Sequence, residues 1–274
     1  MPFRVEPAPS FKSVLGNGGR PRAGMWACTG NPLLAEICAG SGFDWVLIDG
    51  EHSINSLESI SVQLQVMAGY PVFPVVRVPS NDTVLIKQYL DLGVQNLIVP
   101  MVDNAGQAEQ AVAAVRYPPR GVRGVGSALA RGSRWNRIEG YLDRAEETIT
   151  LLVQVETAEA VANVAQIAGT DGVDGIFIGP SDLAASMGHL GQQDHPDVVA
   201  AVEQCIRTAV ELGVAVGVNA FVESTARRYL DAGADFIAVG ADVALLARAS
   251  EALAAKYVPQ DPSGSGSGSA PASY

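Results

Sequence analysis

Short runs of apolar, mostly β-branched residues alternate along the chain with longer segments whose apolar residues recur at helical spacing. The short runs predict eight strands, at residues 23–28, 44–49, 73–78, 96–102, 150–156, 174–179, 214–219 and 236–241. The longer segments predict helices near 31–39, 56–68, 81–92, 104–116, 157–168, 197–212, 224–232 and 242–256, with a further helical segment at 136–147. Such alternation is typical of a parallel sheet covered by helices.

Glycines mark where several of the predicted helices end, and a strand follows each of them: Gly69, Gly93, Gly169, Gly213 and Gly233. The repeated order of helix, glycine and strand indicates consecutive βα units. Eight such units favour closure into a (β/α)8 barrel, the TIM-barrel fold of the α/β class. A doubly wound open sheet has the same local alternation and is the alternative.

The length and the end of the chain define the predicted domain. Between Arg22 and Tyr257 nothing resembles an interdomain linker, so residues 1–258 are predicted to form a single barrel domain. Residues 259–274 are rich in Gly and Ser and are predicted to be a disordered tail, because they have too little apolar surface to bury.

Composition narrows the classes of function. Hydrophobic residues make up 48% of the chain and aromatic residues only 6%, so the core is predicted to consist of Ala, Val, Leu and Ile. A net charge of -11 disfavours a nucleic-acid partner, which clustered Lys and Arg would bind. The chain has no signal-like or membrane-spanning apolar run, which predicts a cytoplasmic protein without a membrane partner. Three irregularly spaced cysteines argue against a disulfide framework.

Polar residues interrupt the apolar strands near their last positions, where the active sites of barrels gather. They are Asp49, Arg77, Gln154 and Glu156, and Asp182 follows the strand at 174–179. Taken singly, a carboxylate in such a place is more often a helix cap or an ion-pair partner. Taken together, these residues predict an active site at the C-terminal ends of the strands.

Glu156 and Asp182 are the predicted metal ligands. Gln154 and Glu156 are two residues apart and point to the same side of their strand, where an isolated buried carboxylate would be costly. A bound cation removes that cost. Two carboxylates suit a hard divalent ion such as Mg2+ or Mn2+, which also accepts oxygen ligands from a substrate.

The positions of the lysines disfavour a Schiff-base mechanism. Lys12, Lys87 and Lys256 all lie away from the strand ends, so none is placed to form a Schiff base in the pocket. Metal-assisted enolisation remains as the way to stabilise a carbanion next to a carbonyl. His52 is a candidate general acid or base, oriented by Asp49 three residues earlier.

Five segments resemble one family: FDWVLIDGEHS (43–53), VVRV (75–78), RGVRGVGSALARGSRW (120–135), LLVQVET (151–157) and DGIFIGPSDLAASMG (174–188). They resemble the HpcH/HpaI class II 2-keto acid aldolases of the phosphoenolpyruvate/pyruvate-binding superfamily. This family includes the 4-hydroxy-2-oxoheptanedioate and 2-keto-3-deoxy-L-rhamnonate aldolases. The resemblance extends from about residue 11 to residue 258.

The resemblance implies a TIM barrel assembled as a hexamer, a dimer of trimers in which partners exchange a helix. It implies that Glu156 and Asp182 bind Mg2+, Mn2+ or Co2+, and that Arg77 steadies an enolate oxygen. Asp49 and His52 would assist proton transfer, and Gln154 would reach metal-bound water or the substrate. Main-chain N–H groups around Gly179, Ser181 and Asp182 would hold the carboxylate of pyruvate. Ser181 departs from the alanine expected in several relatives.

The predicted function is therefore reversible aldol addition and cleavage between the enolate of pyruvate or hydroxypyruvate and an aldehyde. The arginines of segment 120–135 are predicted to form salt bridges between subunits or to contact an acidic aldehyde. Two alternatives stay open. One is a CoA-ester lyase of the citrate-lyase-beta type, and the other is a non-catalytic, metal-dependent protein that binds keto acids.

Overall fold

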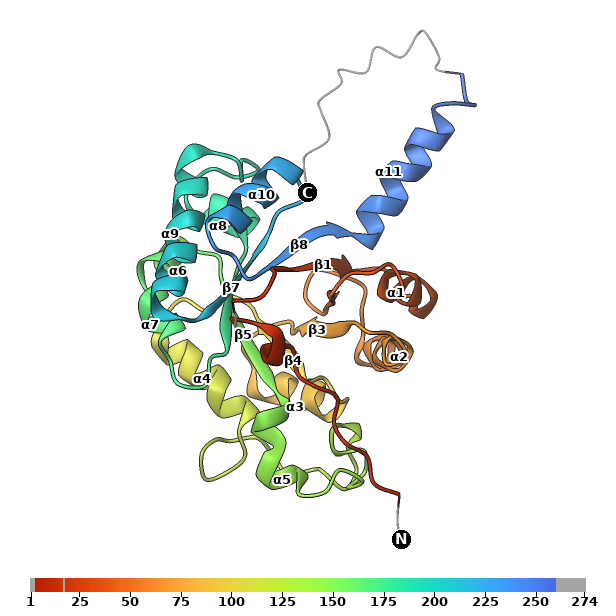
Figure 1. Ribbon diagram of the computed structural model, residues 1–274, viewed down its shortest axis with the longest axis vertical. Helices are drawn as coiled ribbons and strands as arrows, with labels where there is room; N and C mark the ends of the chain where they lie inside the picture. Colours follow the sequence, from red (N-terminus) through yellow and green to blue (C-terminus); the bar gives the residue numbers. More distant parts are fainter. Residues whose placement is uncertain (1–2, 17, 260–274) are drawn as a thin grey trace.

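Eight parallel strands form a closed barrel in the computed structural model, which describes residues 3–16 and 18–259 (Figure 1). The predicted tail, apart from Pro259, lies outside the described residues. The strands are β1 (Arg22–Ala27), β2 (Trp45–Asp49), β3 (Phe73–Arg77), β4 (Asn96–Val99), β5 (Thr150–Val155), β6 (Gly175–Ile178), β7 (Ala215–Asn219) and β8 (Phe236–Ala241). Pairing of β1 with β8 closes the barrel, which confirms the TIM-barrel prediction and excludes the open sheet.

Helices follow the strands around the outside of the barrel (Figure 1). They are α1 (Pro32–Ala39), α2 (Leu57–Met67), α3 (Thr83–Asp91), α4 (Ala105–Val115), α5 (Tyr141–Arg144), α6 (Ala158–Ala162), α7 (Val164–Ala168), α8 (Pro180–Ser186), α9 (Pro196–Leu212), α10 (Glu223–Asp231) and α11 (Asp242–Ala254). Three short 3-10 helices are η1 (Phe11–Val14), η2 (Arg131–Ser133) and η3 (Ala145–Thr148).

Side chains that accept hydrogen bonds from the first turn explain where several helices begin. Asn31, Asp82 and Asn104 cap α1, α3 and α4 in this way, and Ser56 forms a capping box with Ser59 at the start of α2.

Two helix predictions were wrong in part, and one helix was not predicted. The predicted helix 157–168 is two helices that meet at Asn163, and 136–147 is helical only in α5 and the first residues of η3. No helix was predicted at α8, which has 7 residues and is too short to show a clear helical period.

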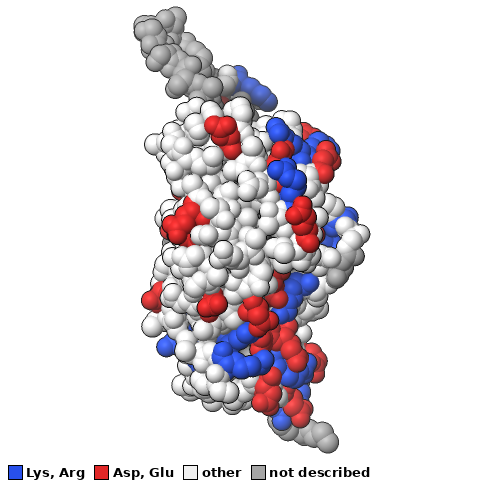
Figure 2. Space-filling view, turned by 90° about the vertical axis from the view of Figure 1, so that its left-hand side faces the viewer, with Lys and Arg blue, Asp and Glu red and all other residues white. Residues whose placement is uncertain are grey.

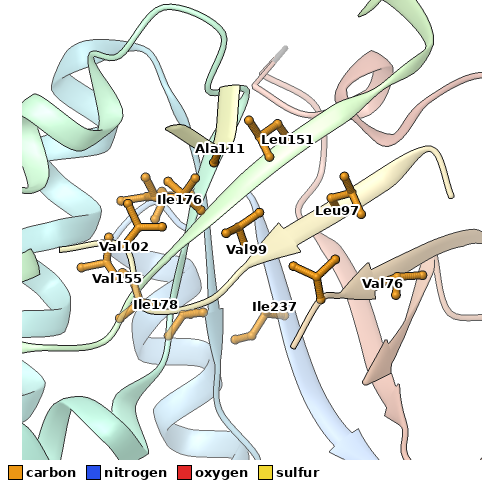
Figure 3. Packing of buried hydrophobic residues seen from close by; sticks show 14 of the residues in the cluster. Val76, Leu97, Val99, Val102, Ala111, Leu151, Val155, Ile176, Ile178 and Ile237 are labelled. Atoms are coloured by element: carbon orange, nitrogen blue, oxygen red, sulfur yellow. The ribbon is translucent and has the colours of Figure 1, made fainter. Parts of the chain in front are cut away.

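Two apolar layers hold the barrel together. Aliphatic side chains fill the space between strands and helices, as Figure 3 shows for Val99, Leu151 and Ile176 from the sheet and Ala111 from α4. The inside of the barrel is different, because it holds aromatic rings. The predicted aliphatic core is thus correct for the outer layer and incomplete for the inner one, where aromatic rings lie among Leu47, Ile98 and Leu152.

The aromatic rings close one end of the barrel. Phe11 of η1 packs against Trp45, Phe73 and Phe236 at centroid distances of 5.5 to 5.7 Å. The main-chain N–H of Phe11 donates to Asn96 Oδ1 at the first residue of β4. Because η1 covers the N-terminal ends of the strands, the opposite end is the one left for a site.

The last helix stands apart from the barrel. In Figure 1, α11 projects outward from the end of β8 and does not lie alongside the strands. Asp242 is its only buried residue, whereas Val243, Leu245, Leu246 and Leu253 are exposed. Its first turn meets the barrel, where Ala244 packs against the inner cluster, but Leu245, Leu246 and Leu253 lack a packing partner among the described residues.

Basic and acidic side chains lie close together on the face drawn in Figure 2, mostly along one edge, and wide areas of that face carry neither. Among the described residues, none of the helices combines the length and the apolar character needed to cross a membrane.

Candidate active site

A cavity of about 550 Å³ opens at the C-terminal ends of the strands. Its lining includes most of the predicted site residues: Asp49, His52, Arg77, Gln154, Gly179, Ser181 and Asp182. Glu156 lies directly beside it, because its Oε2 accepts a hydrogen bond from the Gln154 side chain. The barrel thus brings together residues as distant in the sequence as Asp49 and Asp182.

A larger and more open groove of about 860 Å³ lies between α2, α3 and segment 126–135. It contains none of the predicted site residues. We therefore assign the candidate active site to the smaller cavity at the strand ends, where the titratable groups converge.

Arg77 is fixed from three sides. In the paired strands β2 and β3 it is the register partner of Asp49, and its Nε donates to Asp49 Oδ1 at 2.9 Å. Its Nη1 lies 3.0 Å from Glu51 Oε2, and its Cζ lies 4.5 Å from the centre of the Trp26 ring. Although burial opposes the charge, the neighbouring carboxylates, with Asp49 foremost, raise the pKa of Arg77. A rigid cation therefore faces the cavity.

Asp49 orders the loop that carries His52. Its Oδ1 accepts from the main-chain N–H of Glu51 at 3.0 Å, and its Oδ2 accepts from that of His52 at 3.2 Å. The sequence predicted that Asp49 would orient the imidazole itself, and the structure differs on this point. The carboxylate near the exposed His52 ring is Glu51, whose Oε1 lies 3.8 Å from His52 Nε2.

Glu51 is a site residue that the sequence reasoning did not single out. Burial raises the pKa of Glu51, and Asp49 and Asp182 add to the effect, while Arg77 and His52 oppose it. Its place directly after Asp49 and before His52 was the available signal. The sequence could not show that its carboxylate turns back onto Arg77.

Glu156 is almost completely buried, at 2% exposure. Its Oε1 accepts a hydrogen bond of 2.8 Å from the main-chain N–H of Met101, which follows β4 with a positive φ of 53°. Such a φ is strained for a residue other than glycine and is often found at functional sites. Burial raises the pKa of Glu156 to about 7, and Asp182 and Glu51 add to this rise.

These observations fit a divalent cation. The carboxylates of Glu156 and Asp182 are near enough for Asp182 to raise the pKa of Glu156, so a cation between them would relieve both burial and repulsion. Gln154 Oε1 is buried without a hydrogen-bond partner among the described residues. Carboxylate and amide oxygens are hard ligands of the kind that Mg2+ and Mn2+ prefer.

Gly179 gives the carboxylate of Glu156 its space. A Cβ at this position would lie 2.8 Å from Glu156 Oε2 and 2.9 Å from Gln154 Nε2. The residue after it, Pro180, begins α8, so the same close approach sets where Asp182 lies in the first turn.

Changing Gly179 to alanine is expected to lower the free energy of unfolding by about 1–3 kcal/mol, because overpacking displaces buried side chains. Urea unfolding measures this loss. Gly240→Ala is the matched control, since nothing lies within 4 Å of the position that a Cβ would take at this residue of β8. Equal losses in both variants would contradict the assigned role of Gly179.

The other side of the cavity holds residues that the sequence reasoning missed: Trp26, Cys28, Phe177, Asn219, Phe221, Ala241, Val243 and Ala244. Trp26 Nε1–H donates to Asn219 Oδ1 at 2.8 Å. Most of these residues are apolar and read as core positions in the sequence. In the part of the cavity that contains Arg77 and Asp182, the Ser181 hydroxyl donates a hydrogen bond of 3.0 Å to the side-chain oxygen of Gln193.

One other cluster of potential ligands lies outside the cavity, formed by His189, His195 and Asp197. The two imidazole rings stack with their centroids 3.6 Å apart. His195 Nδ1 also accepts a hydrogen bond from the main-chain N–H of Asp197 and so caps α9. These are the contacts of a helix start.

Comparison with known proteins gives a consistent result. The model of the family described as HpcH/HpaI aldolase/citrate lyase matches residues 22–249. A hydroxypyruvate/pyruvate aldolase from Deinococcus radiodurans is 56% identical over 258 residues, which cover 94% of this chain and 93% of that protein. A 4-hydroxy-2-oxo-heptane-1,7-dioate aldolase from Escherichia coli is 55% identical over 248 residues, which cover 90% of this chain and 94% of that protein.

Among solved structures, an HpcH/HpaI aldolase/citrate lyase family protein from Burkholderia cenocepacia has a TM-score of 0.87. Its sequence is 39% identical, and the match covers 91% of this chain and 99% of that one.

Proposed function

The chain belongs to the HpcH/HpaI aldolase/citrate lyase family, and from this premise we propose that it is a metal-dependent class II aldolase. In this proposal, it joins the enolate of pyruvate or hydroxypyruvate to an aldehyde and cleaves the product. The observation that carries the proposal is the buried carboxylate of Glu156, which lies with Arg77 and Asp182 at the C-terminal end of the barrel. The CoA-ester lyase is not favoured, because relatives that match over 90% of the chain are named aldolases.

Glu156 and Asp182 would hold the divalent ion, with Mg2+, Mn2+ and Co2+ as the candidates. When bound, this ion supplies Lewis acidity, which makes the C3 proton of a keto acid easier to remove. Gln154 fits beside it, because its buried side-chain oxygen is available to a ligand or a water molecule.

Arg77 would stabilise the charge that develops on the enolate oxygen. Its contacts with Asp49, Glu51 and Trp26 fix the guanidinium before the substrate arrives, so no reorganisation is needed during the reaction. The main-chain N–H groups of Ser181 and Asp182 would hold the carboxylate of the keto acid, because Pro180 has none and that of Gly179 donates to the Val155 carbonyl at 3.2 Å.

His52 would move the proton. Its ring is exposed at the mouth of the cavity, close to Glu51, and so can exchange protons with solvent. In the addition direction His52, or water linked to it, would take up the C3 proton of the keto acid and deliver a proton to the new alkoxide. Cleavage would reverse both transfers, so that the proton taken from the hydroxyl is returned to C3.

Exchange of the pyruvate methyl protons in D2O tests the proposed function without any aldehyde. We expect the methyl signal in the NMR spectrum to decay when protein and Mg2+ or Mn2+ are present, and to persist after a chelator is added. A non-catalytic keto-acid binding protein would leave the signal intact under both conditions. That result would replace the aldolase by the binding protein.

We also propose that copies of this chain exchange α11 within a hexamer, a dimer of trimers. The support is the unpacked apolar helix α11 and a second exposed apolar surface, at Leu33 and Ile37 on α1. In a closed barrel the last helix ordinarily covers the neighbourhood of the first, and a partner's helix can do the same. A cytoplasmic location remains our expectation.

Replacing Leu245 and Leu246 together with glutamine is expected to convert the assembly to smaller species, because both side chains are exposed in the single chain. Light scattering after size exclusion measures the mass. Circular dichroism should show that the barrel keeps its helices, and a hexamer that persists in the double variant would contradict the exchange of α11.

A further inference from the structure

The cavity has two halves of different chemistry. The half described above carries Arg77, His52, Gln154 and Asp182, whereas the other half comes from β1, β7, β8 and the segments that follow them, together with Phe177 of β6. Pyruvate alone does not fill about 550 Å³, so the second half is where the aldehyde would lie. What that half accepts can be inferred from its lining, on the premise of the proposed aldolase function.

The second half offers no positive charge. Arg77 is the only Arg or Lys among the described residues that line the cavity, and Asp49 and Glu51 already neutralise it. Burial raises the pKa of the Cys28 thiol to about 12, so that group is neutral as well. A carboxylate at the far end of an aldehyde would lose its hydration here without gaining a partner.

The arginines of segment 120–135 do not change this charge balance within the chain. Arg131 and Arg134 line the separate groove beside α2 and α3. Arg120 pairs with Glu146 at 2.7 Å, and Arg123 lies 3.5 Å from Asp91. The sequence expectation that this segment contacts an acidic aldehyde thus finds no support in the cavity lining.

Asn219 places a hydrogen-bonding group in this mostly apolar half. Its Oδ1 is engaged by Trp26 Nε1–H at 2.8 Å, which fixes the orientation of the amide. Its Nδ2 donates no hydrogen bond to the residues that the structure describes, and the side chain is half-buried in the cavity lining. Two N–H donors are therefore held for an acceptor that enters with the ligand.

Trp26 connects Asn219 to the reacting half. The face of its indole lies 4.5 Å from Arg77 Cζ, and the edge of the same ring contacts Asn219. Only the width of one indole therefore separates the enolate-stabilising cation from the free amide N–H groups. An oxygen bound by Asn219 would be near the reacting carbonyl and not at the end of a long chain.

We propose that this enzyme selects short, uncharged aldehydes that carry a hydroxyl group next to the carbonyl, and that Asn219 recognises that hydroxyl. The hydroxyl oxygen accepts from Asn219 Nδ2, while Phe221, Val243 and Ala244 pack against the short carbon chain. A longer aldehyde with a terminal carboxylate is disfavoured by the same lining.

The test compares glycolaldehyde with acetaldehyde, which differ by the hydroxyl, and with succinic semialdehyde, which carries a carboxylate. With saturating pyruvate and Mn2+, kcat/KM is measured for each aldehyde in the wild-type protein and in Asn219→Leu. The ratio of glycolaldehyde to acetaldehyde is expected to fall about tenfold in the variant, the loss of one hydrogen bond in a partly buried site. Acetaldehyde serves as the internal control, because a general structural defect lowers both values together.

Asn219→Val, which suits the end of strand β7, repeats the measurement if the leucine variant does not fold. An unchanged ratio in the folded variant overturns the proposal, and so does a wild-type preference for succinic semialdehyde over glycolaldehyde. These failures differ from failure of the aldolase function itself. Wild-type protein that exchanges the pyruvate methyl protons remains an enolising enzyme, whatever aldehyde it prefers.

Discussion

Replacing Arg77 with alanine is expected to lower kcat for aldol addition by roughly 10²–10³-fold, the usual cost of removing one fixed donor from developing negative charge. The effect is large because Asp49, Glu51 and Trp26 hold the guanidinium in place and water cannot substitute for it in the same geometry. Steady-state kinetics with saturating pyruvate and Mn2+ measures the loss. A kcat within tenfold of the wild type would contradict the role assigned to Arg77.

Loss of stability has to be separated from loss of catalysis in that experiment. Alanine leaves the buried carboxylate of Asp49 without its partner, which costs about 3–5 kcal/mol when a buried pair is broken on one side. Arg77→Lys is the matched control, because it keeps a positive charge beside Asp49. One ammonium does not reproduce the planar fork that reaches Glu51 as well. The lysine variant should therefore recover stability in urea unfolding while kcat stays low.

The sequence was sufficient to predict the barrel because each of its signals is local. Apolar runs and helical spacing recur in eight units, glycines mark the end of several of the helices, and the structure closes the units in chain order. The convergence of Asp49, Arg77, Gln154 and Asp182 on one cavity follows from the same regularity, since parallel strands bring their C-terminal ends together. Their chemical roles remain proposals.

The features of the site that the sequence missed depend on how a side chain is oriented or what it packs against. Asp49 precedes His52 by three residues, and only the fold shows that its carboxylate binds the main chain and Arg77. In the sequence, Asn219 is simply a polar residue at the end of β7. Only the fold shows that a hydrogen bond from Trp26 orients its amide. Such contacts join residues far apart in the sequence, and periodicity does not encode them.

α11 illustrates a different limit. Its apolar residues predict a helix at 242–256, and the helix is present over Asp242–Ala254. The structure nevertheless places it away from the strands (Figure 1). A hydrophobic pattern predicts that one face of a helix is buried, but it does not predict whether the same chain or a second copy covers that face.

Replacing Glu156 with glutamine is expected to remove metal-dependent turnover by roughly 10³-fold or more, because the loss of a ligand charge removes several kcal/mol of Lewis-acid stabilisation. Affinity for Mn2+, measured by isothermal titration calorimetry, should fall by at least about 10²-fold, since even residues that only orient metal ligands contribute 10 to 100-fold. Glutamine has nearly the same shape as glutamate, so a side chain of similar size would still pack against Gln154 and the main chain of Met101.

The same variant changes how the stability of the metal-free protein depends on pH. Burial raises the pKa of Glu156 from 4.5 to about 7 in the folded state, so the protonated form stabilises the fold. This stabilisation is complete below pH 4.5 and is lost as the pH rises through about 7, a change of about 3 kcal/mol. Unfolding in urea with a chelator present should show a larger decline in the wild type than in Glu156→Gln, in which the raised pKa of Glu51 still contributes.

A divalent ion should reverse the decline in the wild type, because the ionised carboxylate then has a cation to bind and metal binding stabilises the folded state by mass action. The variant should gain little from the same ion. If Mn2+ stabilised both proteins equally at pH 8, the ion would be bound elsewhere, and Glu156 would be a buried structural acid whose proton, and not a metal, balances its burial.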